Sequence, residues 1–286
     1  MIIRLFLSLI FAVVPVLSFV RVSRMSSGRS LNLHKSDAWI DLPSGRSHNN
    51  TNNSDGMITI IGFGSLLSEQ SSRLTFPELS NFRLGRIPHY RRVFGHVASI
   101  FFQRGIANFD TLECSSLSAE YVSDDFPGFI CTLFEVSTEG LMEDGVPSHA
   151  FREREEEFNI ITVPFLELDS SPSKCQQQQQ QGLLCARSSD DIYIRQWGQE
   201  RYHRNYKSYG IPTIWDWKED SGLKPCSVYL RHCVLAAESM GSDCFNSFLD
   251  ETFLVDRQTT IREYLNENHQ VMTKLPPPEL VDRYRG

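Results

Sequence analysis

The strongest constraint on the fold is one stretch in which an apolar, β-branched run stops at two glycines one residue apart, Ile58-Thr59-Ile60-Ile61-Gly62-Phe63-Gly64-Ser65-Leu66-Leu67. Such a run predicts a buried strand, and the glycines predict a tight loop directly after it. Because glycine reaches positive φ and lets the backbone approach a bound group, the amides around Gly64, Ser65 and Leu66 are expected to converge on a carboxylate. A plain turn is the alternative. No third glycine and no Gly-Lys-Ser/Thr follows at the required spacing, which excludes the two commonest nucleotide-binding loops.

Other apolar segments predict further strands at residues 93–98, 129–136 and 160–165, and the second of these should be central in the sheet. Helices are expected up to Met240, with Gly241 ending the helix, and again after Asp256, whose carboxylate is expected to cap the second one. Strands and helices alternate without a regular βαβ period. The fold class expected for residues 57–268 is therefore α+β, with a mixed curved sheet or small β-barrel and surrounding helices.

An acidic run forms the second notable feature. Ser148 is expected to cap a helix from His149 to Phe158 that contains four glutamates, Glu153, Glu155, Glu156 and Glu157. Helical geometry would place Glu153 and Glu157 on one side and the other two elsewhere, so that one acid enters a pocket while the rest stay solvated. A fully solvated acidic face is the alternative.

Both features resemble motifs of one family. Gly62-Phe63-Gly64-Ser65-Leu66-Leu67 resembles the Tyr-Gly-Ser-Leu loop of the γ-glutamylcyclotransferase-like families, the ChaC and AIG2-like superfamily. Arg154-Glu155-Glu156-Glu157-Phe158 resembles the Arg-Glu-x-Glu-Tyr stretch of its plant-type members, in the same order about ninety residues later. The resemblance implies that Phe63, Gly64, Ser65 and Leu66 bind substrate and that Glu155 is the catalytic acid/base. Arg152-Glu153 also matches the Arg-Glu pair of that motif, which makes Glu153 the alternative acid/base. Phe63 and Phe158 stand where the family has tyrosine.

The function that the resemblance implies is conversion of a γ-glutamyl amine or peptide, with glutathione as one candidate, to 5-oxoproline and the free amine. The substrate's own amine attacks its γ-carbonyl, so that a held geometry and a base are needed but no cofactor and no metal. Burial would raise the pKa of the base, and Arg154 is expected to point away from it. The alternative is a catalytically inactive binding module of the same fold, which the two Tyr-to-Phe departures favour.

Composition narrows the possible partners. A net charge of −7 and a pI near 5.6 argue against nucleic acid, because phosphate binding requires a basic face. The seven cysteines form no Cys-x-x-Cys, and no His/Cys pair has zinc-finger spacing, which argues against a disulfide framework and a metal site. A small-molecule γ-glutamyl substrate is the expected partner, and the sequence leaves the oligomeric state open.

The two ends and one internal segment are expected to lie outside the domain. Residues 1–20 are signal-like, with Arg4 followed by an apolar run, and residues 21–56 form a basic, serine-rich, transit-like segment and a disordered linker. Together they resemble bipartite plastid leaders, with the secretory pathway as the alternative and no membrane span in the mature form. Residues 170–190, rich in glutamine, are expected to form a low-complexity insertion, and residues 269–286 a C-terminal tail.

Overall fold

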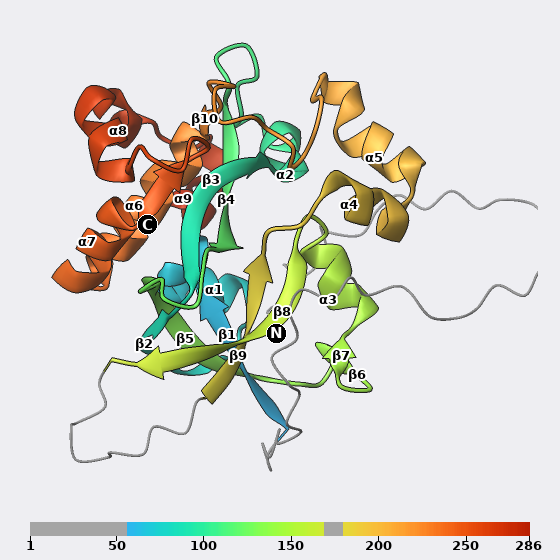
Figure 1. The fold of residues 1–286 in the computed structure, drawn as a ribbon, viewed down its shortest axis with the longest axis vertical. Coiled ribbons are helices and arrows are strands. Elements are labelled where there is room, and N and C mark those ends of the chain that lie inside the picture. The colour runs from blue at the N-terminus through green and yellow to red at the C-terminus, as the bar shows by residue number, and fades with distance from the viewer. Residues whose placement is uncertain (1–55, 169–179) are drawn as a thin grey trace, which may run out of the picture. The chain divides into compact units, whose positions relative to one another are not determined.

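The computed structural model describes residues 56–168 and 180–286 (Figure 1). The predicted leader, apart from Gly56, lies outside the described residues, and so does the segment 169–179. No helix in the described part of the chain is long and apolar enough to cross a membrane.

A closed barrel of five strands forms the centre of the domain. The strands are β1 (Met57–Gly62), β5 (Phe129–Ser137), β2 (Ser80–Ile87), β8 (Asn159–Glu167) and β9 (Gln180–Ala186), hydrogen-bonded in that order. The barrel closes because β9 pairs with β1 in parallel, while the other four contacts are antiparallel. Closure leaves these strands no free edge. The predicted α+β class with a small β-barrel is thus confirmed, and β5 is internal as predicted, between β1 and β2.

A second layer of strands extends from β9. Strand β4 (Glu113–Tyr121) pairs with β9 and with β3 (Tyr90–Val97), and β11 (Thr252–Leu254) and β10 (Lys224–Pro225) add short parallel edges to β3 and β4. A two-stranded hairpin, β6 (Met142–Glu143) and β7 (Val146–Pro147), stands apart from this sheet.

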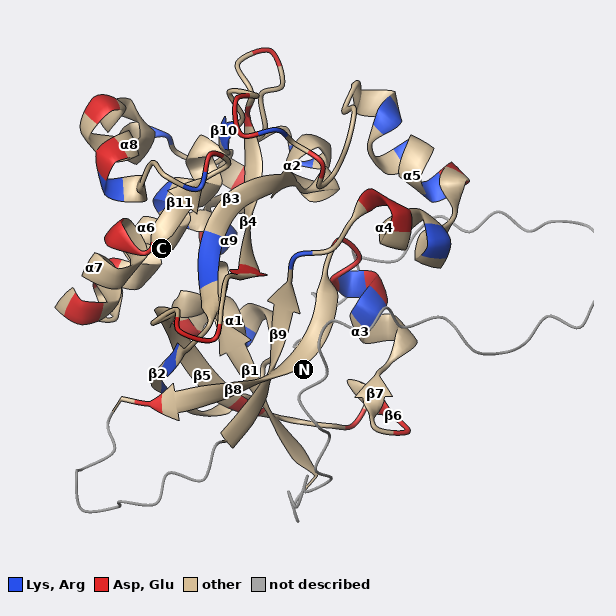
Figure 2. Ribbon diagram, in the orientation of Figure 1, with Lys and Arg blue, Asp and Glu red and all other residues tan. Residues whose placement is uncertain are grey.

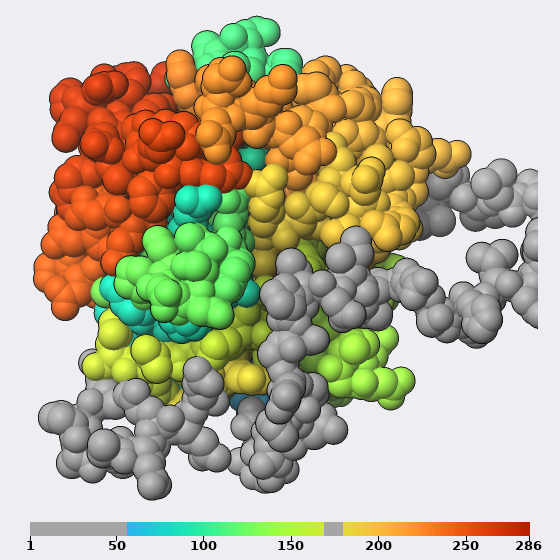
Figure 3. Space-filling view, viewed as in Figure 1, coloured from blue at the N-terminus to red at the C-terminus, as the bar shows by residue number. Residues whose placement is uncertain are grey.

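Helices flank the sheet on two sides (Figure 1). One group is α3 (His149–Arg154), α4 (Asp190–Trp197), α5 (Gln199–Asn205) and the 3-10 turn η2 (Lys207–Tyr209); the other is α6 (Ser227–Ser239), α7 (Ser242–Asp250), α8 (Ile261–Glu267), η3 (His269–Thr273), η4 (Pro278–Leu280) and α9 (Val281–Tyr284). Between them lie η1 (Ser65–Leu67), α1 (Glu69–Thr75) and α2 (Ser99–Gln103). In the space-filling view the second group, in orange and red, covers one side of the molecule (Figure 3).

The main core is built from alternate residues of the barrel strands. Ile61, Leu133, Phe165 and Leu184 are among the buried side chains of one cluster, which α6 and α7 complete from outside. A second cluster surrounds Trp215 and includes buried tyrosines of α4 and α5 and of the residue that follows α5. The first cluster follows the period-2 alternation expected of strands with one buried face.

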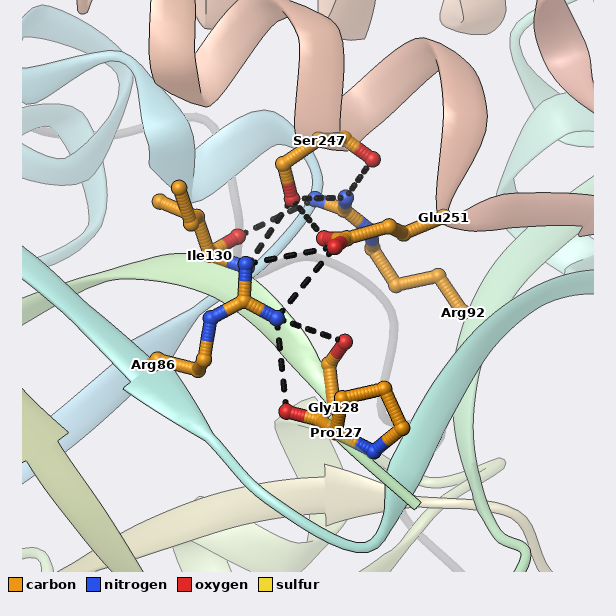
Figure 4. Close-up of polar contacts among 7 residues, drawn as sticks. All are labelled: Arg86, Arg92, Pro127, Gly128, Ile130, Ser247 and Glu251. Carbon is orange, nitrogen blue, oxygen red and sulfur yellow. Dashed lines mark hydrogen bonds and ion pairs between the residues drawn. The ribbon is translucent and has the colours of Figure 1, made fainter.

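Helix α7 is joined to the barrel by a buried polar cluster (Figure 4). Arg92 of β3 is fully buried and donates to the carbonyl oxygens of Ile130 and Ser247, at 3.2 and 2.6 Å. The Ser247 hydroxyl accepts the Ile130 amide at 2.9 Å and donates to Glu251, which in turn pairs with Arg86 at 3.2 Å. Burial lowers the pKa of Arg92 to about 10, so the guanidinium stays charged near neutral pH. The cluster therefore fixes α7 in one register on β3 and β5.

Two predicted boundaries are wrong. The C-terminal part of the predicted 170–190 insertion, Gln180–Ala186, is barrel strand β9, because Leu183 and Leu184 are buried on its two faces. The predicted tail 269–286 packs on the domain through η3, η4 and α9, where Tyr284 is buried and accepts a hydrogen bond from Arg104. Residues 269–286 are therefore part of the domain and not a tail outside it.

One predicted cap is also wrong. Helix α8 begins after Thr260, which forms a reciprocal capping box with Glu263, and not after Asp256. Asp256 instead accepts the amides of Gln258 and Thr259 in the preceding turn. The helix that ends before Gly241 is α6, as predicted, and φ is 98° at that glycine.

Candidate functional site

The glycine loop follows β1 as predicted, but its glycines serve a different purpose from the expected one. Neither glycine has positive φ, and Gly64 has φ of −131°. The loop needs glycine because there is no room for a side chain at either position. A Cβ at Gly64 would lie 2.6 Å from the Tyr229 hydroxyl, and one at Gly62 would lie 2.5 Å from Oγ1 of Thr132. Both contacts are too short for any side chain, so the loop requires glycine for close approach.

The loop backbone is held by two hydrogen bonds to one of its carbonyl oxygens. The Thr132 hydroxyl donates to the carbonyl oxygen of Leu66 at 2.8 Å, and Ser72 donates to the same oxygen at 3.0 Å. The amides of Gly64 and Leu66 have no acceptor among the described residues. The Ser65 amide faces the hydroxyl oxygen of Tyr229. Unpaired amides on a fixed loop are the arrangement that binds an anionic or carbonyl oxygen.

Phe63 and Tyr229 are the two aromatic residues in contact with this loop, and they contribute differently to it. Phe63 is buried in the barrel core and packs edge-on against Phe129, with ring centroids 6.1 Å apart, so its side chain contributes packing. Tyr229 of α6 lies between Phe94 and Phe101 and brings its hydroxyl to Gly64. Tyr229 could not be predicted from the sequence, because no pattern separates a tyrosine in an apolar helix from a core residue.

The acidic run is only partly helical. Ser148 caps α3 as predicted, accepting the Phe151 amide at 3.2 Å, but the helix ends at Arg154 and the chain turns through residues 155–158. The glutamates after Arg154 do not follow helical spacing. The prediction that Glu153 and Glu157 share one helix face is therefore wrong.

Glu155 and Glu153 lie near the surface. The Glu155 side chain is 26% exposed and accepts from Nε of Arg154 at 3.2 Å. Arg154 was expected to point away from the base, and that prediction is wrong for Glu155. Glu153 is more exposed, at 49%, and pairs with Arg201 of α5 at 2.9 Å.

Glu157 is the buried member of the run. Its Oε1 accepts the Tyr206 hydroxyl at 2.7 Å and the Ser99 amide at 3.3 Å, while its backbone carbonyl accepts Nε1 of Trp215 at 3.1 Å. Burial, with a smaller contribution from Glu156, raises the pKa of Glu157 to about 7, although the bonds from Tyr206 and Ser99 act in the opposite direction. A carboxyl that titrates near neutral pH is suited to accept and return a proton.

Helix α2 links Glu157 to the glycine loop. Ser99, its first residue, donates to the Glu157 carboxylate, and Phe101, two residues later, packs against Tyr229 with ring centroids 4.9 Å apart. Tyr229 in turn meets Gly64. A single short helix therefore contacts both halves of the candidate site.

The wall behind Glu157 is apolar and aromatic. His96 is fully buried, stacks on Trp215 at 4.2 Å and meets Phe158 edge-on at 5.0 Å. Neither ring nitrogen has a hydrogen-bond partner among the described residues, and burial lowers the pKa of His96 to about 3. The imidazole is therefore neutral and adds no charge to the surroundings of Glu157. No group of three or more His, Cys, Asp or Glu in the described part of the chain is placed to hold a metal ion.

Comparisons with known proteins give low similarities. No family model and no curated protein sequence matches the chain. Among solved structures, one described as a γ-glutamyl cyclotransferase is 12% identical, with a TM-score of 0.32 over 56% of this chain and 90% of that one. A yeast γ-glutamyl cyclotransferase specific to glutathione is 12% identical, with a TM-score of 0.34 over 77% and 96%. An uncharacterised human protein is 13% identical, with a TM-score of 0.32 over 57% and 92%. Similarities of this size do not establish the activity of this chain.

Proposed function

We propose that the chain is a γ-glutamylcyclotransferase-type enzyme that converts a γ-glutamyl amine or peptide to 5-oxoproline and the free amine. The observation that carries this proposal is a buried carboxyl with a pKa of about 7, joined through α2 to a loop that has unpaired backbone amides. The motif resemblance supports the same reaction. Glutathione is the first candidate substrate to test.

The roles follow from the needs of an intramolecular reaction. The α-amine of the substrate attacks its own γ-carbonyl carbon, a ring N–C bond forms, and the original amide C–N bond breaks. The amides of Gly64 and Leu66 hold the γ-glutamyl unit so that the amine and the carbonyl stay in contact. A carboxylate takes the proton from the attacking amine and returns it to the leaving nitrogen, so no proton is gained or lost overall.

Three glutamates are candidates for the role of the base. The resemblance selects Glu155, with Glu153 as the alternative, whereas burial, contacts and pKa favour Glu157. We propose Glu157, because Glu155 is paired with Arg154 at the surface. The active form of a general base is deprotonated, so kcat/KM is expected to rise with pH up to about 7 and then to level off.

The test is release of 5-oxoproline from glutathione and from γ-glutamyl dipeptides by the purified protein and by three Glu→Gln variants. Glu157→Gln is expected to lower kcat by roughly 10²–10⁴-fold, whereas Glu155→Gln and Glu153→Gln leave it nearly unchanged. If kcat falls in the Glu155→Gln variant alone, Glu155 is the base, as the resemblance implies. No effect of any variant on a working enzyme would remove the acidic run from the mechanism.

The second candidate function is a binding module without catalysis. Its supporting observation is that Phe63 lies in the core and brings no hydroxyl to the loop, where the family has tyrosine. Saturable binding of γ-glutamyl compounds by the unmutated protein, with no 5-oxoproline formed over long incubation, would replace the enzyme proposal with this one.

A further inference from the structure

Three arginines converge on one buried carboxylate of the sheet. Glu120 of β4 is buried and pairs with Arg91 of β3 at 3.6 Å. It also pairs with Arg187, which follows β9, at 2.7 Å and with Arg257, which follows β11, at 2.8 Å. Figure 2 shows basic positions on each of these three segments. We call the three arginines the arginine cluster.

The arginine cluster carries more positive charge than this carboxylate can balance. Burial would raise the pKa of Glu120, but hydrogen bonds from Arg257 and Arg187 outweigh burial and hold that pKa below the ordinary value, so Glu120 is ionised. Three positive charges thus meet one negative charge, which leaves a surplus of two. Arg257 alone already binds both carboxylate oxygens, through Nε and Nη2. Neutralising Glu120 therefore does not account for the other two arginines.

Further acids lie near the arginine cluster, namely Glu219, Asp216 and Asp256. None of them forms an ion pair with an arginine of the cluster among the described residues. Glu219 and Asp216 are exposed, and Asp256 accepts two amides of its own turn. Because water screens exposed charges, these acids offset the surplus only in part.

Arg91 gives an independent indication of a ligand. Its ion pair with Glu120 is the longest of the three, and its Nε is buried with no hydrogen-bond partner among the described residues. Burial lowers the pKa of Arg91, and the charge of Arg257 acts in the same direction, against Glu120 and Glu219. A buried donor without an acceptor costs free energy, and the crowding of like charges adds to that cost. A bound anion would reduce both.

The arginine cluster is accessible from solvent and held in place. The side chains of Arg91, Arg187 and Arg257 are 24, 33 and 16% exposed, whereas Glu120 is buried. An anion can therefore meet the arginines without displacing Glu120. Arg187 and Arg257 each donate to a backbone carbonyl oxygen as well, which fixes their guanidinium groups. Groups that are fixed before binding lose little conformational freedom when a ligand binds.

The charge and the donors of the arginine cluster select a phosphate group. Guanidinium groups bind the oxygens of phosphates and carboxylates in pairs. A monocarboxylate would balance only one of the two surplus charges, whereas a phosphate dianion balances both. Phosphate oxygens also point in several directions, which suits guanidinium groups that come from three separate segments.

We propose that the arginine cluster binds a phosphate dianion, either free or as a phosphate monoester. None of the three arginines pairs with a glutamate of the acidic run among the described residues, so this site is separate from the proposed base. The inference does not rest on the proposed function.

The test is calorimetric titration of the full chain with sodium phosphate at pH 8, where phosphate is mainly a dianion, and with sodium acetate at the same ionic strength. Saturable phosphate binding is expected, with acetate at least about tenfold weaker. Arg187→Gln, at the most exposed arginine of the cluster, is expected to raise the phosphate Kd about tenfold or more. Arg187→Lys should raise it less, because lysine keeps the charge without the planar fork. Arg204→Gln, at an exposed arginine of α5 outside the cluster, is the matched control and should leave Kd unchanged.

Glycerol phosphate, titrated in parallel, distinguishes the two sources of the phosphate group. Binding tighter than that of inorganic phosphate would assign a phosphate monoester as the ligand, and equal or weaker binding would assign free phosphate. Both results support the site.

Three results would overturn the proposal. They are absence of saturable phosphate binding, equal binding of acetate, and equal weakening by Arg204→Gln, which would indicate attraction to basic surface in general. If Arg187→Gln fails to fold, as its melting curve would show, Arg91→Gln takes its place with the same expected weakening. Arg91 makes the longest contact with Glu120, so its loss disturbs that carboxylate least.

Discussion

Glu157→Gln should change the pH dependence of stability in a way that can be calculated from the structure. In the folded protein the pKa of Glu157 is raised from the ordinary value of 4.5 to about 7, chiefly by burial. The folded state therefore binds this proton more tightly than the unfolded state. Below pH 4.5 both states are protonated and the contribution to stability is complete. As pH rises from about 4.5 to about 7 the contribution is lost, and above pH 7 the loss stays constant.

The size of the effect follows from the difference between the two pKa values. At 1.36 kcal/mol for each pKa unit, the difference corresponds to about 3 kcal/mol of unfolding free energy. Glutamine cannot ionise, and its amide oxygen can still accept from Tyr206 and Ser99 as the Glu157 carboxylate does. The variant should therefore gain about 3 kcal/mol relative to the unmutated protein between pH 4.5 and pH 8.

The assay is urea unfolding of both proteins at closely spaced pH values, with the difference in unfolding free energy plotted against pH. Other titrating groups are common to both proteins and cancel in the difference. A step centred between pH 4.5 and pH 7 is expected. A difference that is independent of pH would show that the Glu157 carboxyl is solvated, and the argument for it as the acid/base would then fail.

The remaining predictions concern separate parts of the molecule. Ser247→Ala should lower the unfolding free energy by about 3 kcal/mol, because it leaves a buried amide unpaired and removes two further hydrogen bonds; a loss below 1 kcal/mol would contradict this. Leu184→Ala should cost about 2–5 kcal/mol in chemical denaturation if β9 closes the barrel, and almost nothing if that strand belongs to an insertion. Gly64→Ala should weaken γ-glutamyl binding, and adding Tyr229→Phe should restore part of it, since the clash is with that hydroxyl; failure of the double variant to recover would place the constraint elsewhere. Residues 1–50 fused to a fluorescent protein should reach an organelle, and a diffuse cytosolic signal would refute the leader.

The sequence predicted the parts of the fold that local patterns determine. The runs that became β1, β5 and β8 are strongly apolar and bounded by glycine, proline or polar residues, so their strand character did not depend on distant contacts. The α+β fold class and the small barrel were predicted from these strands. The pairing of β9 with β1, which closes the barrel, could not be predicted, because neither strand has a sequence pattern that indicates a parallel partner.

Two errors have the same physical origin. Strand β9 begins at Gln180, inside a glutamine-rich run, and its low-complexity start concealed the buried Leu183 and Leu184 a few residues later. In the C-terminal segment, Tyr284 is a single buried aromatic in a polar, proline-rich context. In both cases tertiary packing orders a segment whose polar composition is typical of a disordered one.

The sequence predicted where the loop and the acidic run lie in the fold, but not the contacts that their residues make. The loop after β1 is where the glycines predicted it, but the need for glycine at position 64 comes from Tyr229, a residue about 165 positions later that no local pattern connects to it. Helical periodicity could not rank the glutamates because α3 ends at Arg154, within the acidic run. A helix that stops one turn early changes the direction of every later side chain, and Glu157 is buried for that reason.

The contacts of Glu157 also bear on why an acid stands at this position. Its carboxylate accepts a hydrogen bond from the first amide of α2, and capping of that helix would by itself explain a polar side chain here. A glutamine, however, would accept the same bonds from Ser99 and Tyr206 without the cost of about 3 kcal/mol that ionisation of a buried carboxyl carries above pH 7. Capping therefore accounts for an oxygen at this point but not for a group that gains and loses a proton. The proposed proton transfer needs such a group, which is why the exchange of Glu157 for glutamine tests the proposal directly.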